Sequence, residues 1–453
     1  MLEDTIAAIA TPLGEAGLSV IRVSGKDALL LVDRIYQSPS GQKKLVKQKS
    51  HTLHYGFIYY QGELVDEVMI AIMKGPKSYT AEEVVEIQCH GGILTSKKVL
   101  ESVLASGARL ATPGEFTRRA FINGRIDLTQ AEAVHDLIHA RSSKAMQVAK
   151  EQMQGALSRK IETVRDDLLS VLAHVEAHID FPDEDIAPDT IEMLSTRILN
   201  AIAFSQKLID SAEDGRLLRQ GIRTVIVGKP NAGKSSLLNL LLGEERAIVS
   251  DVEGTTRDTI EEFASINGVP IIFIDTAGIR ETHDKIEREG IKRSRASIES
   301  ADLVLHIIDI THALHKEDLE FHKQWANKNI ITVCNKHDLN PSFVKTGLPN
   351  PISLSCKTEE GIDSLKQQIG DLFWSGEIDN SSDQVMINSR HEVLLKKAQE
   401  SLVKAKETLA EEWSLEITAM ELRLATGAIG EIVGKTSTED LLDKIFSEFC
   451  LGK

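Results

Sequence analysis

The stretch GKPNAGKS at residues 228–235 decides the fold of this chain. An apolar, β-branched run at residues 222–227 precedes it, and leucines recur at helical spacing over residues 237–242. A buried strand followed at once by a helix predicts a strand-to-helix turn between them. The spacing of the glycines and of the final Lys-Ser is that of a phosphate-binding loop.

The chemistry of this loop explains its composition. Gly228 and Gly233 allow positive φ angles, so that backbone N–H groups turn inward, and the N-terminus of the following helix adds partial positive charge. In such loops, the lysine, here Lys234, reaches the β- and γ-phosphates, and the hydroxyl of Ser235 ligates Mg²⁺. We therefore expect a nucleoside triphosphate site.

Two downstream segments select the base. NKHD at residues 335–338 follows an apolar strand at 330–334, and SCK at 355–357 follows a strand at 351–354. A carboxylate at Asp338 accepts paired hydrogen bonds from the N1–H and amino group of guanine, which adenine does not offer. The sequence therefore predicts a GTPase that prefers GTP to ATP.

Two further segments belong on the metal side of the nucleotide. DTAG at residues 275–278 follows the strand 271–274, so that Asp275 holds Mg²⁺ through water and the Gly278 N–H meets the γ-phosphate. GTTRD at residues 254–258 lies where a threonine hydroxyl completes the metal shell, which predicts the first switch.

The residue that orients the attacking water is not in its usual place. Ile279 stands where many small GTPases have glutamine. A carboxylate acting through water is suitable, and Glu281, Glu287 and Glu289 are all candidates. The residues alone do not rank the three.

Composition limits the remaining functions. The 453 residues carry a net charge of −16, which argues against binding nucleic acid through bulk electrostatics, and the basic run at residues 43–49 is interpreted as a solvated loop. Four scattered cysteines, and no signal peptide or membrane-length apolar run, predict a cytoplasmic protein without membrane association. Histidines four apart, such as His135 and His139, lack a third ligand, so no zinc is expected.

The pattern along the chain predicts a multidomain α/β fold. Residues 1–120 mix short strands and helices. The pattern is helical almost without interruption over 129–180 and helical again over 190–212 and near the C-terminus, where the last helix opens with the capping pattern Ser437-x-x-Asp440. We expect a nucleotide domain, with a mixed, mostly parallel sheet and flanking helices, inserted into an α-helical domain.

Segments outside the nucleotide domain carry a family resemblance. TPGEFTRRAFINGRIDLTQAEA at residues 112–133, SYT at 78–80, CHGG at 89–92 and the terminal FCLGK at 449–453 closely resemble the MnmE (TrmE) family of tRNA-modification GTPases. The resemblance implies an α+β N-terminal folate-binding and dimerisation domain (1–120), a helical domain in two parts (121–215 and 378–453) and an inserted TrmE-type GTPase domain (216–377).

The same resemblance implies a function. Proteins of this family act as homodimers with the FAD-dependent partner MnmG, in a heterotetramer. Together they attach an aminomethyl or carboxymethylaminomethyl group to C5 of the wobble uridine of certain tRNAs. The one-carbon unit comes from 5-formyl- or 5,10-methylene-tetrahydrofolate, and hydrolysis of GTP depends on Mg²⁺ and K⁺.

Individual residues follow from the matched motifs. Catalytic roles are implied for Glu287, which positions the water and so is favoured among the three glutamates, and for Lys234 and Asn231. Ser235 and Thr256 would hold Mg²⁺. A K⁺ ion, in the place of an arginine finger, would be held by Asn231, Ser250, Val252 and Thr255. The full set expected to contact GTP is Asn231, Ala232, Gly233, Lys234, Ser235, Ser236, Ser250, Asp251, Val252, Glu253, Gly254, Thr255, Thr256, Asp275, Thr276, Ala277, Gly278, Asn335, Lys336, Asp338, Ser355, Cys356 and Lys357.

For folate, the matching positions are Arg22, Glu86, Arg125 and Lys453. A carboxylate pairs with the amide and amidine edge of a pterin, and arginines suit the glutamate tail. Cys450 is the family's terminal cysteine, close to where the one-carbon unit would lie.

Two other functions share the nucleotide motifs. A ribosome-assembly or signalling GTPase would act as a binding switch, but would be expected to carry a basic RNA-binding module, whereas the flanks here are acidic helices. A folate-dependent one-carbon enzyme with GTP as its regulator would bind folate without changing any tRNA.

Overall fold

The computed structural model describes residues 4–41, 44–181, 188–243, 261–274, 295–342, 347–373, 385–410 and 415–453. The chain divides into two compact units. The first comprises Met1–His135, Leu157–Ala177 and Ala419–Lys453, and the second comprises Asp136–Ala156 and His178–Thr418.

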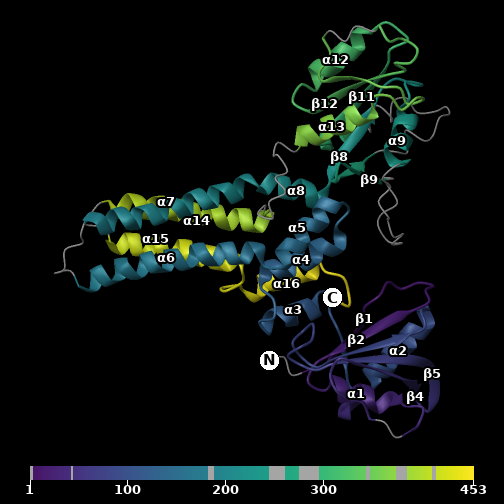
Figure 1. Cartoon of the computed structure of the whole chain (residues 1–453), viewed down its shortest axis with the longest axis vertical. Helices are drawn as coiled ribbons and strands as arrows, with labels where there is room; N and C mark the ends of the chain where they lie inside the picture. Colours follow the sequence, from purple (N-terminus) through teal and green to yellow (C-terminus); the bar gives the residue numbers. More distant parts are fainter. Residues whose placement is uncertain are drawn as a thin grey trace. The chain divides into compact units, whose positions relative to one another are not determined.

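The first unit contains a seven-stranded sheet (Figure 1) with the strand order β3-β4-β5-β6-β2-β1-β7. Its strands are β1 (Ile6–Ile9), β2 (Ser19–Ser24), β3 (Tyr36–Gln37), β4 (Thr52–Tyr60), β5 (Glu63–Met73), β6 (Val84–Cys89) and β7 (Arg109–Leu110). Neighbours pair antiparallel except β1 with β7. Helices α1 (Ala28–Ile35) and α2 (Ile93–Ala105) bury their apolar stripes in one core with the sheet. The register of β2 and β6 sets Arg22 opposite Glu86.

Five helices complete the first unit: α3 (Glu115–Ile122), α4 (Leu128–His139), α6 (Ala156–Asp180), α15 (Leu415–Ile432) and α16 (Glu439–Ser447). Helix α16 joins α3 through the Arg118–Asp443 ion pair at 2.7 Å, and helix α15 joins α6 through Arg423 and Glu176 at 2.7 Å. Helices that follow the nucleotide domain are therefore held against helices that precede it in the sequence.

The stretch over residues 129–180 is helical almost throughout, as predicted, but it is divided into three helices, of which α4 is the first. The helix ends at His139, and α5 (Ser143–Met153) begins again behind Ser142, whose side chain accepts a hydrogen bond from the Ala145 N–H. A second break falls at Gly155, which has φ +81°, a conformation that stops a helix. The cap of α16 also differs by one residue, because Thr438 and not Ser437 accepts from the Leu441 N–H.

The second unit contains a six-stranded sheet with the order β13-β12-β11-β8-β10-β9. Its strands are β8 (Ile222–Val227), β9 (Glu262–Ile266), β10 (Val269–Phe273), β11 (Leu303–Asp309), β12 (Asn329–Asn335) and β13 (Pro351–Ser353). Only the edge strand β9 is antiparallel, so the predicted mixed, mostly parallel sheet is confirmed. Helices α9 (Lys234–Gly243) and α13 (Ile362–Phe373) share one apolar core with the sheet, and α12 (Lys316–Gln324) packs against another.

The sheet of the second unit is inserted between helices, as predicted. The chain enters it from α7 (Pro188–Asp210) and α8 (Ala212–Gln220) and returns as α14 (Ser389–Leu409), which lies alongside α7 (Figure 1). Arg219 donates to the carbonyl of Ile387 at 2.8 Å, which ties the exit of the sheet to its entry. Among the described helices, none combines the length and apolar character needed to cross a bilayer.

Candidate functional site

The phosphate loop connects β8 to α9 at the carboxyl edge of the sheet. Gly228 has φ +153°, and a Cβ atom there would lie 2.3 Å from the carbonyl oxygen of Ile307. Gly233 has φ +106°, and a Cβ atom there would lie 2.2 Å from Nδ2 of Asn335. Both glycines are therefore required by backbone angle and by space. Asn231, at φ +61°, forms the exposed tip of the loop.

The side chain of Lys234 reaches back to the start of the phosphate loop. Its Nζ donates to the carbonyl oxygens of Gly228 and Lys229, both at 2.9 Å. Burial lowers the pKa of this ammonium group below its ordinary value. A cation held by two carbonyls at the N-terminus of a helix can exchange them for phosphate oxygens.

The base-side segments meet the phosphate loop through Asn335, the last residue of β12. Its Nδ2 donates to the carbonyl of Ala232 at 2.8 Å, and its Oδ1 accepts from the Cys356 N–H at 3.1 Å. Ser355 donates to Oδ1 of Asp338 at 2.7 Å. Three motifs that are separate in sequence are thus joined by side chains that the sequence singled out.

One residue of this site, Asp309, belongs to none of the sequence motifs. Asp309, at the end of β11, accepts from Nζ of Lys336 at 2.5 Å and from the hydroxyl of Thr311 at 2.6 Å. Burial by itself raises the pKa of Asp309, but these hydrogen bonds outweigh it and the net shift is downward. Its place at the carboxyl end of a parallel strand, beside the phosphate-loop strand, is the signal that would have found it.

The structure places the predicted nucleotide residues as follows. Ser235 and Ser236 open α9, and Lys357 is exposed beside Cys356. The remaining predicted residues lie outside the described part of the chain: Ser250, Asp251, Val252, Glu253, Gly254, Thr255, Thr256, Asp275, Thr276, Ala277, Gly278 and Glu287.

A second polar site lies in the first unit and contains the four residues matched to folate binding. Arg22 on β2 contacts Oε1 of Glu86 on β6 at 2.8 and 2.9 Å, and also donates to the carbonyl of Gly452 at 3.2 Å. Burial and the nearby Arg22 charge lower the pKa of Lys453. The structure therefore brings residues from the first and last segments of the chain into one cluster.

Tyr79 is at the centre of this cluster, although the sequence marked it only as part of a motif. Its ring centroid lies 5.3 Å from the Arg22 guanidinium carbon, 5.1 Å from that of Arg125 and 5.9 Å from Nζ of Lys453. Cations at these distances are attracted by the face of an aromatic ring. Cys450 is exposed at the edge of the same segment, and its carbonyl accepts from the Lys453 N–H at 3.3 Å.

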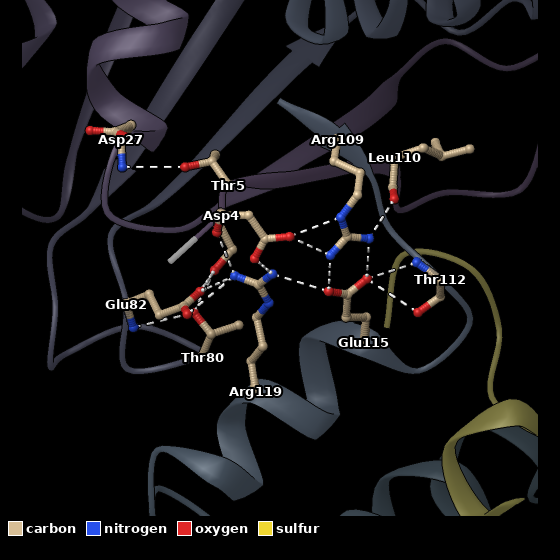
Figure 2. Close-up of polar contacts among 11 residues, drawn as sticks. Asp4, Thr5, Asp27, Thr80, Glu82, Arg109, Leu110, Thr112, Glu115 and Arg119 are labelled. Atoms are coloured by element: carbon tan, nitrogen blue, oxygen red, sulfur yellow. Dashed lines mark hydrogen bonds and ion pairs between the residues drawn. The ribbon is translucent and has the colours of Figure 1, made fainter. Parts of the chain in front are cut away.

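An ionic network centred on the buried Arg119 (Figure 2) includes Glu82, which lies in the same loop as Tyr79. The Arg119 side chain is fully buried and contacts Asp4, Glu82 and Glu115. Arg109 pairs with the same Asp4 and Glu115 at 2.6 and 2.7 Å. Two guanidinium groups shared among three carboxylates satisfy charges that would be costly to bury alone.

The geometry of the second unit defines a class of protein. A phosphate loop at a strand-to-helix turn is joined through Asn335 to the base-side loop that carries Asp338. That loop has the guanine-reading sequence NKHD. This arrangement is that of a P-loop GTPase, an enzyme that hydrolyses GTP.

Comparison with known proteins agrees with the GTPase class and also indicates the family. Residues 5–125 match the family model described as GTP-binding protein TrmE N-terminus, and residues 128–450 match that of the MnmE helical domain. The chain is 45% identical to the tRNA modification GTPase MnmE of Clostridioides difficile (strain 630), over the whole length of both chains. It is also 45% identical to that of Geobacillus thermodenitrificans (strain NG80-2), over 99% of each. The chain belongs to the MnmE family of tRNA modification GTPases.

A solved structure is similar to about a third of the chain. The G domain of the T. maritima FeoB iron transporter is 24% identical to this chain, which covers 97% of that domain. The match spans 33% of the chain described here, with a TM-score of 0.25.

Proposed function

We propose that this chain acts with the FAD-dependent protein MnmG to attach an aminomethyl or carboxymethylaminomethyl group at C5 of the wobble uridine of certain tRNAs, using a tetrahydrofolate one-carbon unit. Membership of the MnmE family supports the tRNA substrate. The observation that carries the folate part is the cluster of Arg22, Glu86, Arg125 and Lys453 around Tyr79. A carboxylate set among cations suits a ligand that has both a pterin edge and an anionic tail.

The residues of the nucleotide site would divide the work of hydrolysis. Lys234 would bind the β- and γ-phosphates, and Ser235 with Thr256 would hold Mg²⁺, which offsets charge on the phosphates. Glu287 would orient the attacking water. Support for Lys234 is the place of its ammonium inside the curve of the loop, bonded to carbonyl oxygens that phosphate can replace.

A K⁺ ion would neutralise charge that develops between the β- and γ-phosphates, which an arginine finger does in other GTPases. Asn231 fits as a ligand because its side chain is exposed at the tip of the loop, held there by a positive φ angle. Ser250, Val252 and Thr255 would complete the set. Purified protein should hydrolyse GTP faster in KCl than in NaCl of equal ionic strength, and Asn231→Ala should remove the difference. Equal rates of the unaltered protein in both salts would refute the K⁺ proposal.

The modification itself is tested on tRNA. Nucleosides from cells that lack this protein should lose the modified wobble uridine. A plasmid encoding the unaltered protein should restore it, and one encoding Glu287→Ala should not. Unchanged nucleosides in the deletion strain would refute the modification proposal and leave the GTPase activity intact, and folate binding would then distinguish a one-carbon enzyme from a binding-switch GTPase.

We also propose that the functional protein is a homodimer formed through residues 1–120, with the helical domain at 121–215 and 378–453 and the GTPase domain at 216–377. Sedimentation of the purified chain should give twice the monomer mass, and addition of MnmG should give a heterotetramer. A monomer at micromolar concentration would contradict the dimer.

A further inference from the structure

The cations around Tyr79 differ in how many of their donors are already used. Arg22 directs Nε and one terminal nitrogen to Glu86 and the other terminal nitrogen to the Gly452 carbonyl, so all three of its nitrogens are engaged. Arg125 is exposed and uses one terminal nitrogen, on the carbonyl of Tyr79 at 2.9 Å. Within the part of the chain that the structure describes, no hydrogen bond engages Nζ of Lys453. Arg125 and Lys453 therefore keep donors for a ligand.

These cations are held together against their mutual repulsion. Glu86 is the one carboxylate paired with Arg22 among the described residues, and the face of the Tyr79 ring supplies the other attraction that the three cations share. A site with more local positive charge than its own carboxylate balances favours an anionic ligand. Two cations with spare donors suit a ligand that carries two carboxylates.

Tyr79 is itself fixed at several points. Its hydroxyl lies 2.9 Å from Oγ1 of Thr117 on α3. The next carbonyl, of Thr80, accepts from Nδ2 of Asn123 at 2.7 Å. Glu82 accepts from Ser24 at 2.7 Å and pairs with the fully buried Arg119 (Figure 2). These contacts therefore fix the ring and the loop that carries it.

We infer that Tyr79 is the positioning residue of this cluster: its ring sets the spacing of Arg125 and Lys453, whose spare N–H groups receive the two carboxylates of a folate glutamate tail. Arg22 then orients Glu86 and the backbone at Gly452 through its hydrogen bonds, and does not contact the tail. The inference rests on the proposed folate function and assigns separate roles within it.

Two ligands test this on the full-length protein by titration calorimetry. 5-Formyltetrahydrofolate carries the glutamate tail, and 5-formyltetrahydropteroate lacks only that glutamate. Two charge-assisted contacts to the tail should make the unaltered protein prefer the first ligand by at least roughly tenfold. Tyr79→Met fills the space without an aromatic face and should bring this preference to within about twofold, since the cations lose their spacing. Tyr79→Phe keeps the ring and should keep the preference.

A double-mutant cycle separates positioning from folding. Arg125→Gln should remove most of the tail preference in the unaltered protein and almost none in Tyr79→Met. Equal losses in the two backgrounds would overturn the role of Tyr79. Tyr79→Met must also melt within a few degrees of the unaltered protein. If it does not, Tyr79→Leu replaces it under the same criterion.

The binding of the two ligands distinguishes a failure of the folate proposal from a failure of the role assigned to Tyr79. If the unaltered protein binds neither ligand, the folate proposal fails. If it binds both ligands equally, folate binding stands but the assignment of Arg125 and Lys453 to the tail is overturned. If it prefers the tail and Tyr79→Met prefers it as strongly, the positioning role is overturned.

Discussion

Nδ2 of Asn335 donates a hydrogen bond to the carbonyl oxygen of Ala232 at 2.8 Å, so the segment that carries Asp338 also holds the loop between β8 and α9. Asn335→Asp replaces this donor with an acceptor that faces the same carbonyl. We expect affinity for GTP and GDP to fall by roughly tenfold to a hundredfold, because a buried acceptor is left without its donor. Fluorescent-nucleotide titration measures this. Asn329→Ala, at the exposed start of the same strand, is the control and should bind normally.

Asp338 should decide which base is accepted. Asp338→Asn exchanges a carboxylate for an amide, so one acceptor toward guanine is lost and a donor takes its place. GTP affinity should fall by roughly a hundredfold, and xanthosine triphosphate, which offers a carbonyl where guanine has an amine, should bind better than GTP. Ser355→Ala removes only the 2.7 Å hydrogen bond to Asp338 and should weaken GTP binding without changing this preference. An Asp338→Asn protein that still prefers GTP would contradict the assignment.

The ionic network of the first unit should make its stability sensitive to acid. Burial by itself raises the pKa of Glu115, but hydrogen bonds from Arg109, from the Thr112 N–H and from Arg119 bring it to about 2. Because the folded pKa is below the unfolded one, the contribution is complete above about pH 4.5 and is lost as the pH falls toward 2. It amounts to about 3 kcal/mol. Asp4 is shifted in the same direction.

Hydrogen exchange of peptides from β1 and β2 measures this acid sensitivity, with results corrected for the intrinsic exchange rate at each pH. Protection should fall between about pH 4.5 and about pH 2.5 in the unaltered protein. Glu115→Gln cannot titrate at this position, so it should start with less protection at neutral pH and lose less on acidification. An equal loss of protection in both proteins would place the titrating group elsewhere.

Gly452 should be intolerant of any side chain. It has φ +89°, and a Cβ atom there would lie 2.5 Å from the carbonyl oxygen of Ile9. Gly452→Ala should therefore displace the terminal segment from β1 and weaken binding of 5-formyltetrahydrofolate by at least roughly tenfold, since Lys453 leaves the cluster. Gly427→Ala, where a Cβ atom meets nothing within 4 Å, is the matched control. Equal folate affinities for the two variants would show that the terminal segment does not contribute.

The mostly parallel character of the nucleotide sheet was predictable because each of its motifs follows an apolar strand, and parallel strands present their carboxyl ends at one edge. The place of Asp309 in the site was not predictable, because its strand ends in no recognised motif and its partner Lys336 lies in another segment. Tyr79 was missed for a similar reason. The cations around it come from residues 22, 125 and 453, and no local pattern indicates that a fold will bring such distant positions together.

For the helical segments, the presence of helices was predictable from the sequence, but the points at which they are interrupted were not. Periodicity correctly predicted helices on both sides of the nucleotide domain, since apolar stripes need partners. It did not predict the interruptions at Ser142 and Gly155, because a side-chain cap and a positive φ angle end the helices there. Local capping chemistry decided these boundaries, and the apolar pattern did not.

The hydrogen bond from Arg22 to the Gly452 carbonyl joins residues that are 430 positions apart. During synthesis, every strand of the first sheet has left the ribosome once residue 110 is free, yet the cluster around Tyr79 lacks its final cation until Lys453 emerges. The whole nucleotide domain is translated in between. A nascent chain can therefore acquire its GTP site before this cluster is complete, and a chain truncated before Lys453 would have the first site and lack the second.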